Sequence, residues 1–321
     1  MNNKILIICG DPNSINSEII FKTWIKLNRN QKRNICLIGN YELLLDQFLK
    51  LKFKVKIIKV NNLDAKITSQ FIKILDIPLK FKNPFKVSLQ SAKEYISQSL
   101  NLAHQLALNK KVKGIINCPV NKDLINSSRK IGVTELLASK CKITDNSEVM
   151  MIHNAKLSVV PITTHIKIKN ISKNISANLI IKKIITLNKD FKKLFRKKPK
   201  IGILGLNPHN SELVKDAEEN VKILPAILSL RKKGIDIQGP IVPDTAFVNI
   251  DKKMDVIVGM YHDQVLSPYK ALFKYDAINL TLGLKYVRVS PDHGPAVDII
   301  CKNKANYTSL LKCVNFISNL K

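Results

Sequence analysis

Short apolar runs alternate with longer amphipathic segments through most of the chain. An apolar run of about four to eight residues between polar turns is typical of a buried strand, and apolar positions at helical spacing are typical of a helix. The pattern predicts strands at 4–9, 34–38, 54–60, 112–116, 149–152, 157–162, 201–206, 254–260 and 278–282, and helices at 17–27, 41–51, 88–108, 176–187, 212–230 and 309–320. Strands separated by helices indicate an α/β fold with right-handed crossovers between parallel strands.

The size and composition are those of a soluble globular protein. The chain has 321 residues, of which 45% are hydrophobic and 24% charged. This length predicts about two domains. No apolar run reaches the ~18 residues that a membrane-spanning helix needs, so we expect no membrane association. The first apolar run leads into Gly10-Asp11-Pro12 without a small-residue cleavage site, which favours a strand over a signal peptide.

The net charge of +29 raises the question of a nucleic-acid partner. The lysines are spread along the whole chain, with one local cluster at 191–198, and no nucleic-acid-binding motif accompanies them. We therefore predict a basic surface that favours small phosphorylated ligands, and no specific nucleic-acid partner. A non-catalytic protein that binds anions or nucleic acid stays open as the alternative of another class.

The cysteines indicate a reducing environment. There are six, and none forms a C-x-x-C pair. Several lie within apolar runs, where a cysteine is typically a buried, reduced thiol. We therefore expect a cytoplasmic protein.

Three of the six histidines share one local setting, because His165, His209 and His262 each follow an apolar strand. In an open α/β sheet, ligands bind outside the carboxyl ends of the strands, so side chains far apart in sequence can meet there. Three neutral imidazoles and an open position form a catalytic metal site, in which the ion polarises a bound alcohol oxygen. A single strand-end histidine is more simply explained by a loop hydrogen bond, but three in matching contexts favour a metal site.

Polar residues in the last third of the chain complete the candidate site. Lys270, Asn279 and Arg288 follow His262, and lysine and arginine are suited to phosphate and carboxylate groups. In a chain with 53 basic residues a solvated surface role is the simpler reading of each one alone. Asp244 follows Pro243, where it is a turn residue, a general base or a residue that orients another site group.

The usual dinucleotide fingerprint, G-x-G-x-x-G, is absent from the sequence. A nicotinamide-dependent enzyme with this sequence would therefore bind its cofactor in another way, and the pattern identifies no cofactor-binding residue. The residues alone predict a metal-dependent α/β enzyme that acts on a small anionic molecule.

A set of short motifs resembles the 4-hydroxythreonine-4-phosphate dehydrogenase family of vitamin B6 biosynthesis. The motifs follow the family's order along nearly the whole chain, and the Asn-Pro-His, Tyr-His-Asp-Gln and Asp-His-Gly blocks are specific in combination. They lie at 10–12, 117–122, 132–135, 163–165, 205–209, 243–245, 260–264, 279–284 and 290–294.

The resemblance implies a fold similar to the isopropylmalate and isocitrate dehydrogenases, which bind NAD without the glycine fingerprint. It implies a first domain at 1–130 plus 275–321, formed by both termini. A second domain at 131–274 would carry the metal ligands and the interface of a homodimer.

The resemblance also implies site residues and a reaction. The family's metal ligands fall on His165, His209 and His262, with His262 supplied by the neighbouring subunit; zinc is favoured, with magnesium or cobalt as alternatives. Substrate contacts fall on Thr134, Lys270, Asn279 and Arg288, and we take Asp244 and Lys270 as catalytic. The reaction would be oxidation of 4-phosphooxy-L-threonine by NAD or NADP, with decarboxylation to 3-amino-2-oxopropyl phosphate.

The sequence departs from the family pattern at a few positions. Ser14 and Asn16 replace glycines after the first strand, Val133 replaces a substrate-contacting histidine, and the glycines after Asn-Pro-His are missing at 211–213. Ser14 should adopt a left-handed conformation less readily than Asn16. Val133 keeps open a related substrate, such as threonate or erythronate 4-phosphate.

Overall fold

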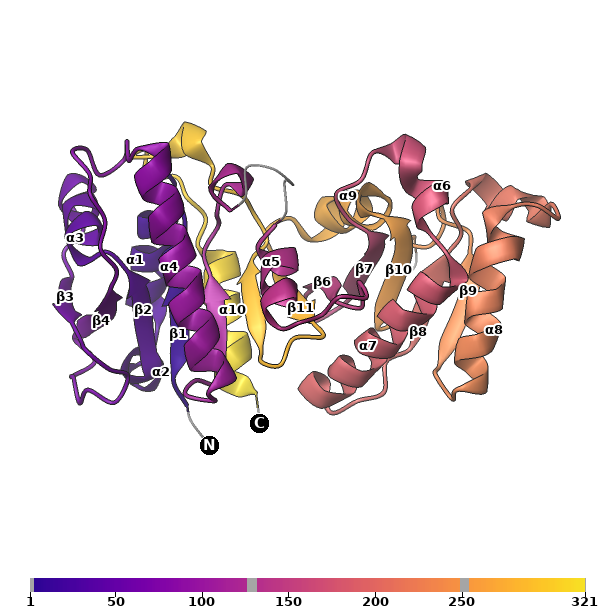
Figure 1. The fold of residues 1–321 in the computed structure, drawn as a ribbon, viewed down its shortest axis with the longest axis horizontal. Coiled ribbons are helices and arrows are strands. Elements are labelled where there is room, and N and C mark those ends of the chain that lie inside the picture. Colours follow the sequence, from indigo (N-terminus) through magenta and orange to yellow (C-terminus); the bar gives the residue numbers. More distant parts are fainter. Residues whose placement is uncertain (1–2, 126–131, 249–253, 321) are drawn as a thin grey trace. The chain divides into compact units, whose positions relative to one another are not determined.

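The computed structural model describes residues 3–125, 132–248 and 254–320. The chain forms two compact units, which we call unit 1 (Met1–Leu137 with Leu284–Lys321) and unit 2 (Ala138–Gly283). Each unit is built on a sheet with helices against it (Figure 1). The two termini of the chain therefore belong to the same unit.

Unit 1 has a parallel sheet in the order β3-β4-β2-β1-β5-β12. Its strands are β1 (Ile5–Ile8), β2 (Ile35–Gly39), β3 (Lys56–Lys59), β4 (Phe71–Asp76), β5 (Gly114–Asn117) and β12 (Arg288–Pro291). Its helices are α1 (Asn16–Lys26), α2 (Arg29–Asn34), α3 (Tyr41–Lys50), α4 (Leu89–Leu108), the start of α5 (Val133–Lys140) and α10 (Thr308–Asn319). The predicted α/β class with parallel strands is confirmed.

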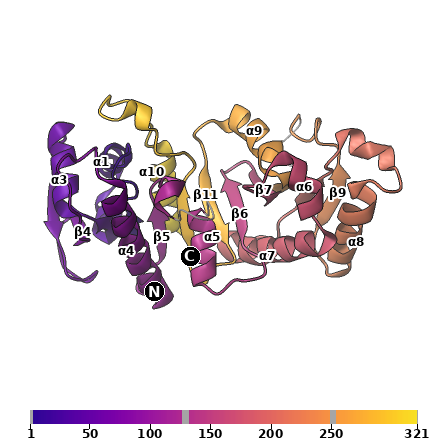
Figure 2. The same cartoon turned by 45° about the horizontal axis from the view of Figure 1, so that its top comes forward.

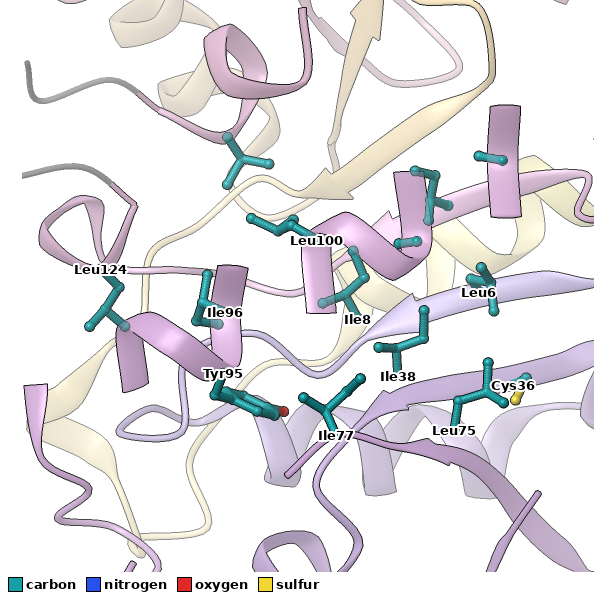
Figure 3. Close-up of a cluster of buried hydrophobic side chains, with 14 of the residues drawn as sticks. Leu6, Ile8, Cys36, Ile38, Leu75, Ile77, Tyr95, Ile96, Leu100 and Leu124 are labelled. Atoms are coloured by element: carbon teal, nitrogen blue, oxygen red, sulfur yellow. The ribbon is translucent and has the colours of Figure 1, made fainter. Parts of the chain in front are cut away.

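The core of unit 1 lies between the sheet and α4. Ile96 and Leu100 of α4 pack with Leu6, Ile8 and Ile38 of the central strands, and all five side chains are buried (Figure 3). Apolar residues of α4 recur at helical spacing, so one stripe of the helix meets the sheet. This burial is the main source of stability for the strands that carry the unit's polar site residues.

Unit 2 has a mixed sheet in the order β11-β6-β7-β10-β8-β9. Its strands are β6 (Val149–His153), β7 (Ser158–Thr163), β8 (Ile201–Leu204), β9 (Ile237–Ile241), β10 (Val256–Tyr261) and β11 (Ile278–Leu282). β6 pairs antiparallel with β7 and β11, whereas β7, β10, β8 and β9 run parallel. The main helices are α6 (Ile171–Asn174), α7 (Ala177–Phe195), α8 (Leu224–Lys232) and α9 (His262–Phe273). α7 packs against α8, while α9 packs against β7 and β10 (Figure 2).

Three strands and four helices of the described residues are not predicted by the periodicity. The strands are β4, β9 and β12, and the helices are α2, α5, α6 and α9. In β4 the apolar run is interrupted by Lys73, which is nonetheless buried because its ammonium group donates to the carbonyl of Arg33. The helix expected at 212–230 is instead a 3-10 segment, a π-helix at Glu219–Ile223 and then α8.

The observed unit boundaries differ from the predicted domain boundaries. The predicted boundary after residue 130 lies outside the described residues. Thr134, expected in the second domain, belongs to unit 1, where Val133 and Leu137 join the core. Asn279, expected in the first domain, belongs to unit 2 because β11 pairs with β6.

Within the described residues, no helix is both long and apolar enough to cross a membrane.

Truncating Leu100 to alanine is expected to lower the free energy of unfolding by about 2–5 kcal/mol, because it removes a buried side chain and leaves a cavity. Urea unfolding followed by circular dichroism measures the change. Leu108→Ala is the matched control, since Leu108 ends the same helix at 38% exposure, and it should cost less than about 1 kcal/mol. Equal losses for the two variants would contradict this placement of the core.

Candidate functional site

The three histidines of the predicted metal site follow adjacent parallel strands of unit 2. His165 follows β7, His262 begins α9 directly after β10, and His209 follows β8. β10 lies between β7 and β8 in the sheet. All three histidines are therefore delivered at the carboxyl edge of the same sheet, which is where α/β sheets bind their ligands.

His165 and His262 lie side by side, with ring centroids 6.0 Å apart and planes inclined by 38°. Two imidazoles that share an ion through nitrogens at ~2.1 Å have centroids about 5–6 Å apart, so this pair fits a shared ion. The His262 Nδ1 is hydrogen-bonded to Asp263 Oδ1 at 2.7 Å, so Nε2 is the nitrogen that could bind a metal ion. A carboxylate on the far nitrogen is the usual support of a metal-binding histidine.

His209 does not join this pair within the chain. Among the described residues, no three histidine, cysteine or acidic side chains come close enough to hold one metal ion. His209 is exposed on the 3-10 segment Pro208–Leu213. The chain by itself therefore brings two of the three predicted ligands together. The pair contains His262, the histidine expected from the neighbouring subunit, because β10 and β7 are adjacent strands of one sheet.

Two side chains that the sequence analysis did not single out fix the loops that carry the histidines. Thr163 Oγ1 donates to the Met260 carbonyl at 2.7 Å, which joins the end of β7 to β10. Gln264 accepts from the Met260 N–H at 2.6 Å and donates to the Gly205 carbonyl at 2.7 Å, which joins α9 to the loop after β8. Thr163 belongs to the Thr-Thr-His motif and Gln264 to the Tyr-His-Asp-Gln motif, so the motifs could have pointed to both residues.

The backbone around His209 is left-handed over four successive residues. The φ angles of His209, Asn210, Ser211 and Glu212 lie between 48° and 55°. Left-handed conformations cost a residue with a Cβ about 1–2 kcal/mol, whereas glycine adopts them freely. Ser211 and Glu212 thus adopt a glycine-like conformation where the family's glycines are missing.

In unit 1, two of the predicted substrate residues contact each other. Arg288 begins β12 and is buried, and its Nη1 donates to Thr134 Oγ1 at 3.3 Å. Its Nε donates to Asn117 Oδ1 at 2.5 Å, from the end of the neighbouring strand β5. Burial lowers the pKa of the Arg288 guanidinium to about 10, so the group is cationic at neutral pH. Asn117 begins the motif at 117–122, but the sequence pattern does not predict this contact.

The other predicted site residues belong to unit 2. Lys270 is half-buried on α9, two turns after His262, which is about 12 Å along the helix axis. Asn279 lies on β11, and its Oδ1 is buried without a hydrogen-bond partner in the described part of the chain. Asp244 is exposed in a turn after the edge strand β9. A buried acceptor without a donor is costly, which favours a ligand role for Asn279.

Ser14 and Asn16, which replace family glycines, do not adopt left-handed backbone. Positive φ occurs at Gly10, at 76°, and at neither of these two residues. Their buried side chains instead tie the loop together. Ser14 Oγ donates to the Asp11 carbonyl at 2.6 Å, and Asn16 Nδ2 donates to the Pro119 carbonyl at 2.8 Å.

Val133, which replaces the family's histidine, is buried in the core of unit 1 with Leu124 and Leu137. Its side chain therefore adds apolar contact and offers no hydrogen bond to a ligand.

A hollow in unit 1 lies near the ends of β3 and β4. It has a volume of about 750 Å³, and its walls include Lys59, Leu63, Asp76 and Leu106. None of the predicted site residues lines it.

Comparisons with known proteins identify relatives along the full length of the chain. The model of the family described as pyridoxal phosphate biosynthetic protein PdxA matches residues 31–317. A 4-hydroxythreonine-4-phosphate dehydrogenase from Sulfurihydrogenibium sp. is 38% identical over 99% of this chain and 98% of its own. A D-threonate 4-phosphate dehydrogenase from Pectobacterium atrosepticum is 30% identical over 97% of both.

Solved structures agree with the sequence relatives. A crystal structure of 4-hydroxythreonine-4-phosphate dehydrogenase from Klebsiella pneumoniae superimposes with a TM-score of 0.86 at 29% identity, covering 99% of this chain and 98% of that one. A β-decarboxylating dehydrogenase from Thermococcus kodakarensis shares the fold, with a TM-score of 0.51 at 10% identity over 98% of this chain and 83% of that one.

Replacing Glu212 with glycine is expected to raise the free energy of unfolding by about 0.5–1 kcal/mol, because relief of the left-handed backbone exceeds the added entropy of the unfolded chain. Chemical unfolding of the purified protein measures it. The control is Glu94→Gly, at an exposed position within α4, which should lower stability by about 1 kcal/mol. A loss of stability from both substitutions would argue against left-handed backbone at Glu212.

Proposed function

Because the chain belongs to the PdxA family of pyridoxal phosphate biosynthetic proteins, we propose that it oxidises 4-phosphooxy-L-threonine with NAD(P)⁺ and a divalent metal ion. The observation that carries the proposal is the pairing of His165 and His262, with Asp263 on the far nitrogen of His262. Two imidazoles oriented in this way suit a catalytic metal ion, and the relatives are named dehydrogenases.

The proposed ligands of the ion are His165, His209 and His262, with zinc favoured over magnesium or cobalt for three imidazoles. The bound ion would supply Lewis-acid polarisation of the substrate hydroxyl, which eases loss of its proton. The hydrogen bond that His262 Nδ1 donates to Asp263 would hold the ring in the required tautomer, with Nε2 facing the ion.

The proposed substrate contacts are Arg288, Thr134, Lys270 and Asn279. Arg288 is a permanent cation whose orientation is fixed by Asn117 and Thr134, which suits a phosphate or a carboxylate. Asn279 offers a buried oxygen to a donor on the substrate. Lys270 and Asp244 are proposed to move protons, Asp244 as the base for the hydroxyl proton.

The proposed reaction has two stages. The C3 hydride passes to NAD(P)⁺ while the hydroxyl proton passes to the base, which leaves a β-keto acid, with the ketone one carbon away from the carboxylate. The carbon–carbon bond to the carboxylate then breaks, releasing CO₂, and a proton returns to carbon to give 3-amino-2-oxopropyl phosphate. The cationic groups bind the anionic ends of the substrate throughout, so the C3 centre stays in place.

A homodimer follows from the incomplete histidine set. Since His165 and His262 meet within one chain and His209 does not, we propose that a second copy supplies His209. Exposed apolar side chains support coverage by a second copy. Ile166, Ile168, Val214 and Val248 all lie in segments that follow strands of unit 2, as the histidines do.

A second substrate has a specific observation in its favour. Val133 is an apolar core residue where the family's substrate-contacting histidine is expected, and some relatives are named D-threonate 4-phosphate dehydrogenase. A substrate without the amino group, D-threonate 4-phosphate, is therefore the second candidate.

The substrate assignment is tested by reduction of NAD⁺ or NADP⁺ in the presence of a divalent metal. We expect NAD(P)H formation with 4-phosphooxy-L-threonine at a kcat/KM at least about tenfold above that with D-threonate 4-phosphate, a difference of about 1.4 kcal/mol. Chelation should abolish the activity, and added metal should restore it. Turnover of D-threonate 4-phosphate alone would establish the second candidate, and turnover that survives chelation would refute the metal.

Mixed dimers test the shared site. His209→Ala and His262→Ala homodimers should each be inactive, but a mixed dimer of the two should regain one site, about half of the wild-type activity per dimer. A mixed dimer of His165→Ala and His262→Ala should stay inactive, because these two ligands come from one copy. Activity in this second mixture, or its absence in the first, would contradict the proposed division of ligands.

A further inference from the structure

Glu219 is a fully buried carboxylate in unit 2, with an exposed fraction of 0%. It begins the π-helix Glu219–Ile223, which leads into α8. Among the described residues, no lysine, arginine or histidine forms an ion pair with it. A buried carboxylate is strongly disfavoured unless hydrogen bonds replace its water, and π-helical turns are frequent at functional sites.

The hydrogen bonds to Glu219 come from the segment that leads to His209. Its Oε1 accepts from the backbone N–H of Leu206 at 2.7 Å and from that of Asn207 at 2.8 Å. Its Oε2 accepts from Asn207 Nδ2 at 3.1 Å. Burial by itself would raise the pKa of Glu219, but the hydrogen bonds from Asn207 and Leu206 lower it below the usual value. The carboxylate is therefore ionised at neutral pH and fixes the backbone just before Pro208 and His209.

Residues 205–207 need such an anchor, because the residues that follow them do not form a regular right-handed helix. His209 and the next three residues are left-handed. On the other side, the Gly205 carbonyl accepts from Gln264. A Cβ at Gly205 would lie 2.0 Å from Asn210 Oδ1 and 3.1 Å from Glu219 Oε1. The close approach of the Asn210 and Glu219 side chains to this backbone therefore requires glycine. Glu219 and Gln264 thus hold the peptide groups that determine where His209 emerges.

We propose that Glu219 is a positioning residue of the metal site, which fixes the loop that presents His209 and adds a negative charge to it. The inference rests on the proposed function in that His209 is a metal ligand. It does not depend on which substrate the enzyme oxidises. A purely structural role would lower the stability of the fold without changing the affinity for metal.

The test is the Co²⁺ affinity of the metal-free full-length protein, measured by competition with a chromophoric chelator in the absence of substrate. Glu219→Gln keeps the shape but removes the charge, and its amide nitrogen meets the Asn207 Nδ2 donor. We expect the Kd for Co²⁺ to rise about 10–100-fold, as for other residues that orient metal ligands. The visible spectrum of bound Co²⁺ should change as well, because His209 is reoriented.

Glu18→Gln is the matched control. Glu18 is equally buried, in unit 1, and accepts from the Ala305 N–H at 2.8 Å and from Lys22 at 2.7 Å. Its substitution should lower thermal stability but leave the Kd for Co²⁺ within about twofold of the wild-type value, because Glu18 lies in the other unit. A change of that size is well below the rise of about 10–100-fold expected for Glu219→Gln. If Glu219→Gln does not fold, Glu219→Asp retains the charge but is one methylene short, and its Kd should rise by a smaller factor.

Wild-type Co²⁺ affinity in the Glu219 variant that folds would overturn the inference, as would an equal loss of affinity in Glu18→Gln. Failure of the proposed function has a different signature. In that case the wild type binds Co²⁺ and the Glu219 variant binds it more weakly, but the wild type reduces NAD(P)⁺ with neither candidate substrate.

Discussion

The pairing of three neighbouring parallel strands, β7, β10 and β8, is the constraint on which the candidate site depends. Parallel pairing brings the carboxyl ends of these strands to one edge, and each strand is followed by one of the three histidines. Pairing alone would leave the loops beyond the strands free to move. The hydrogen bonds from Thr163 and Gln264 remove that freedom, because they tie the loops to the carbonyl groups of neighbouring segments. The histidines are thus held by rigid elements, as a metal site requires.

Charge acts locally in this protein, although the net charge is +29. Exposed lysines are screened by solvent and salt, and they contribute little to specific recognition. Arg288 differs because it is buried on β12 with its guanidinium oriented by Asn117 and Thr134. A cation that is already oriented loses little entropy when an anion binds. One buried arginine therefore matters more for the proposed substrate than the excess of lysines.

The sequence predicted the elements whose pattern is local. The apolar runs of β1, β2 and β8 and the amphipathic stripe of α4 are visible in the residues themselves. β4 was missed because Lys73 interrupts its apolar run. The burial of Lys73 depends on the Arg33 carbonyl, which lies far away in the sequence. The helix expected at 212–230 is not continuous, because residues 208–213 form the left-handed segment that carries His209 and Glu219–Ile223 form a π-helix. Apolar periodicity does not predict either feature.

The same distinction applies to the site. The histidines and Arg288 were singled out because residue type and position after a strand indicate chemistry that they could perform. Asn117 and Glu219 were not singled out, because an amide or a carboxylate that supports another residue has no pattern of its own in one sequence. The lost glycines also had different consequences. Side-chain hydrogen bonds of Ser14 and Asn16 hold the first loop without left-handed backbone, whereas Glu212 keeps the left-handed conformation.

The central claim is that one ion is held by His165 and His262 of one copy and His209 of a second. Anomalous X-ray diffraction from crystals of the zinc-loaded protein tests it most directly. The account predicts one zinc peak for each chain, at about 2.0–2.1 Å from a nitrogen of each of these three histidines. A zinc ion bound by residues of a single chain, or one that leaves His262 without a metal contact, would contradict it.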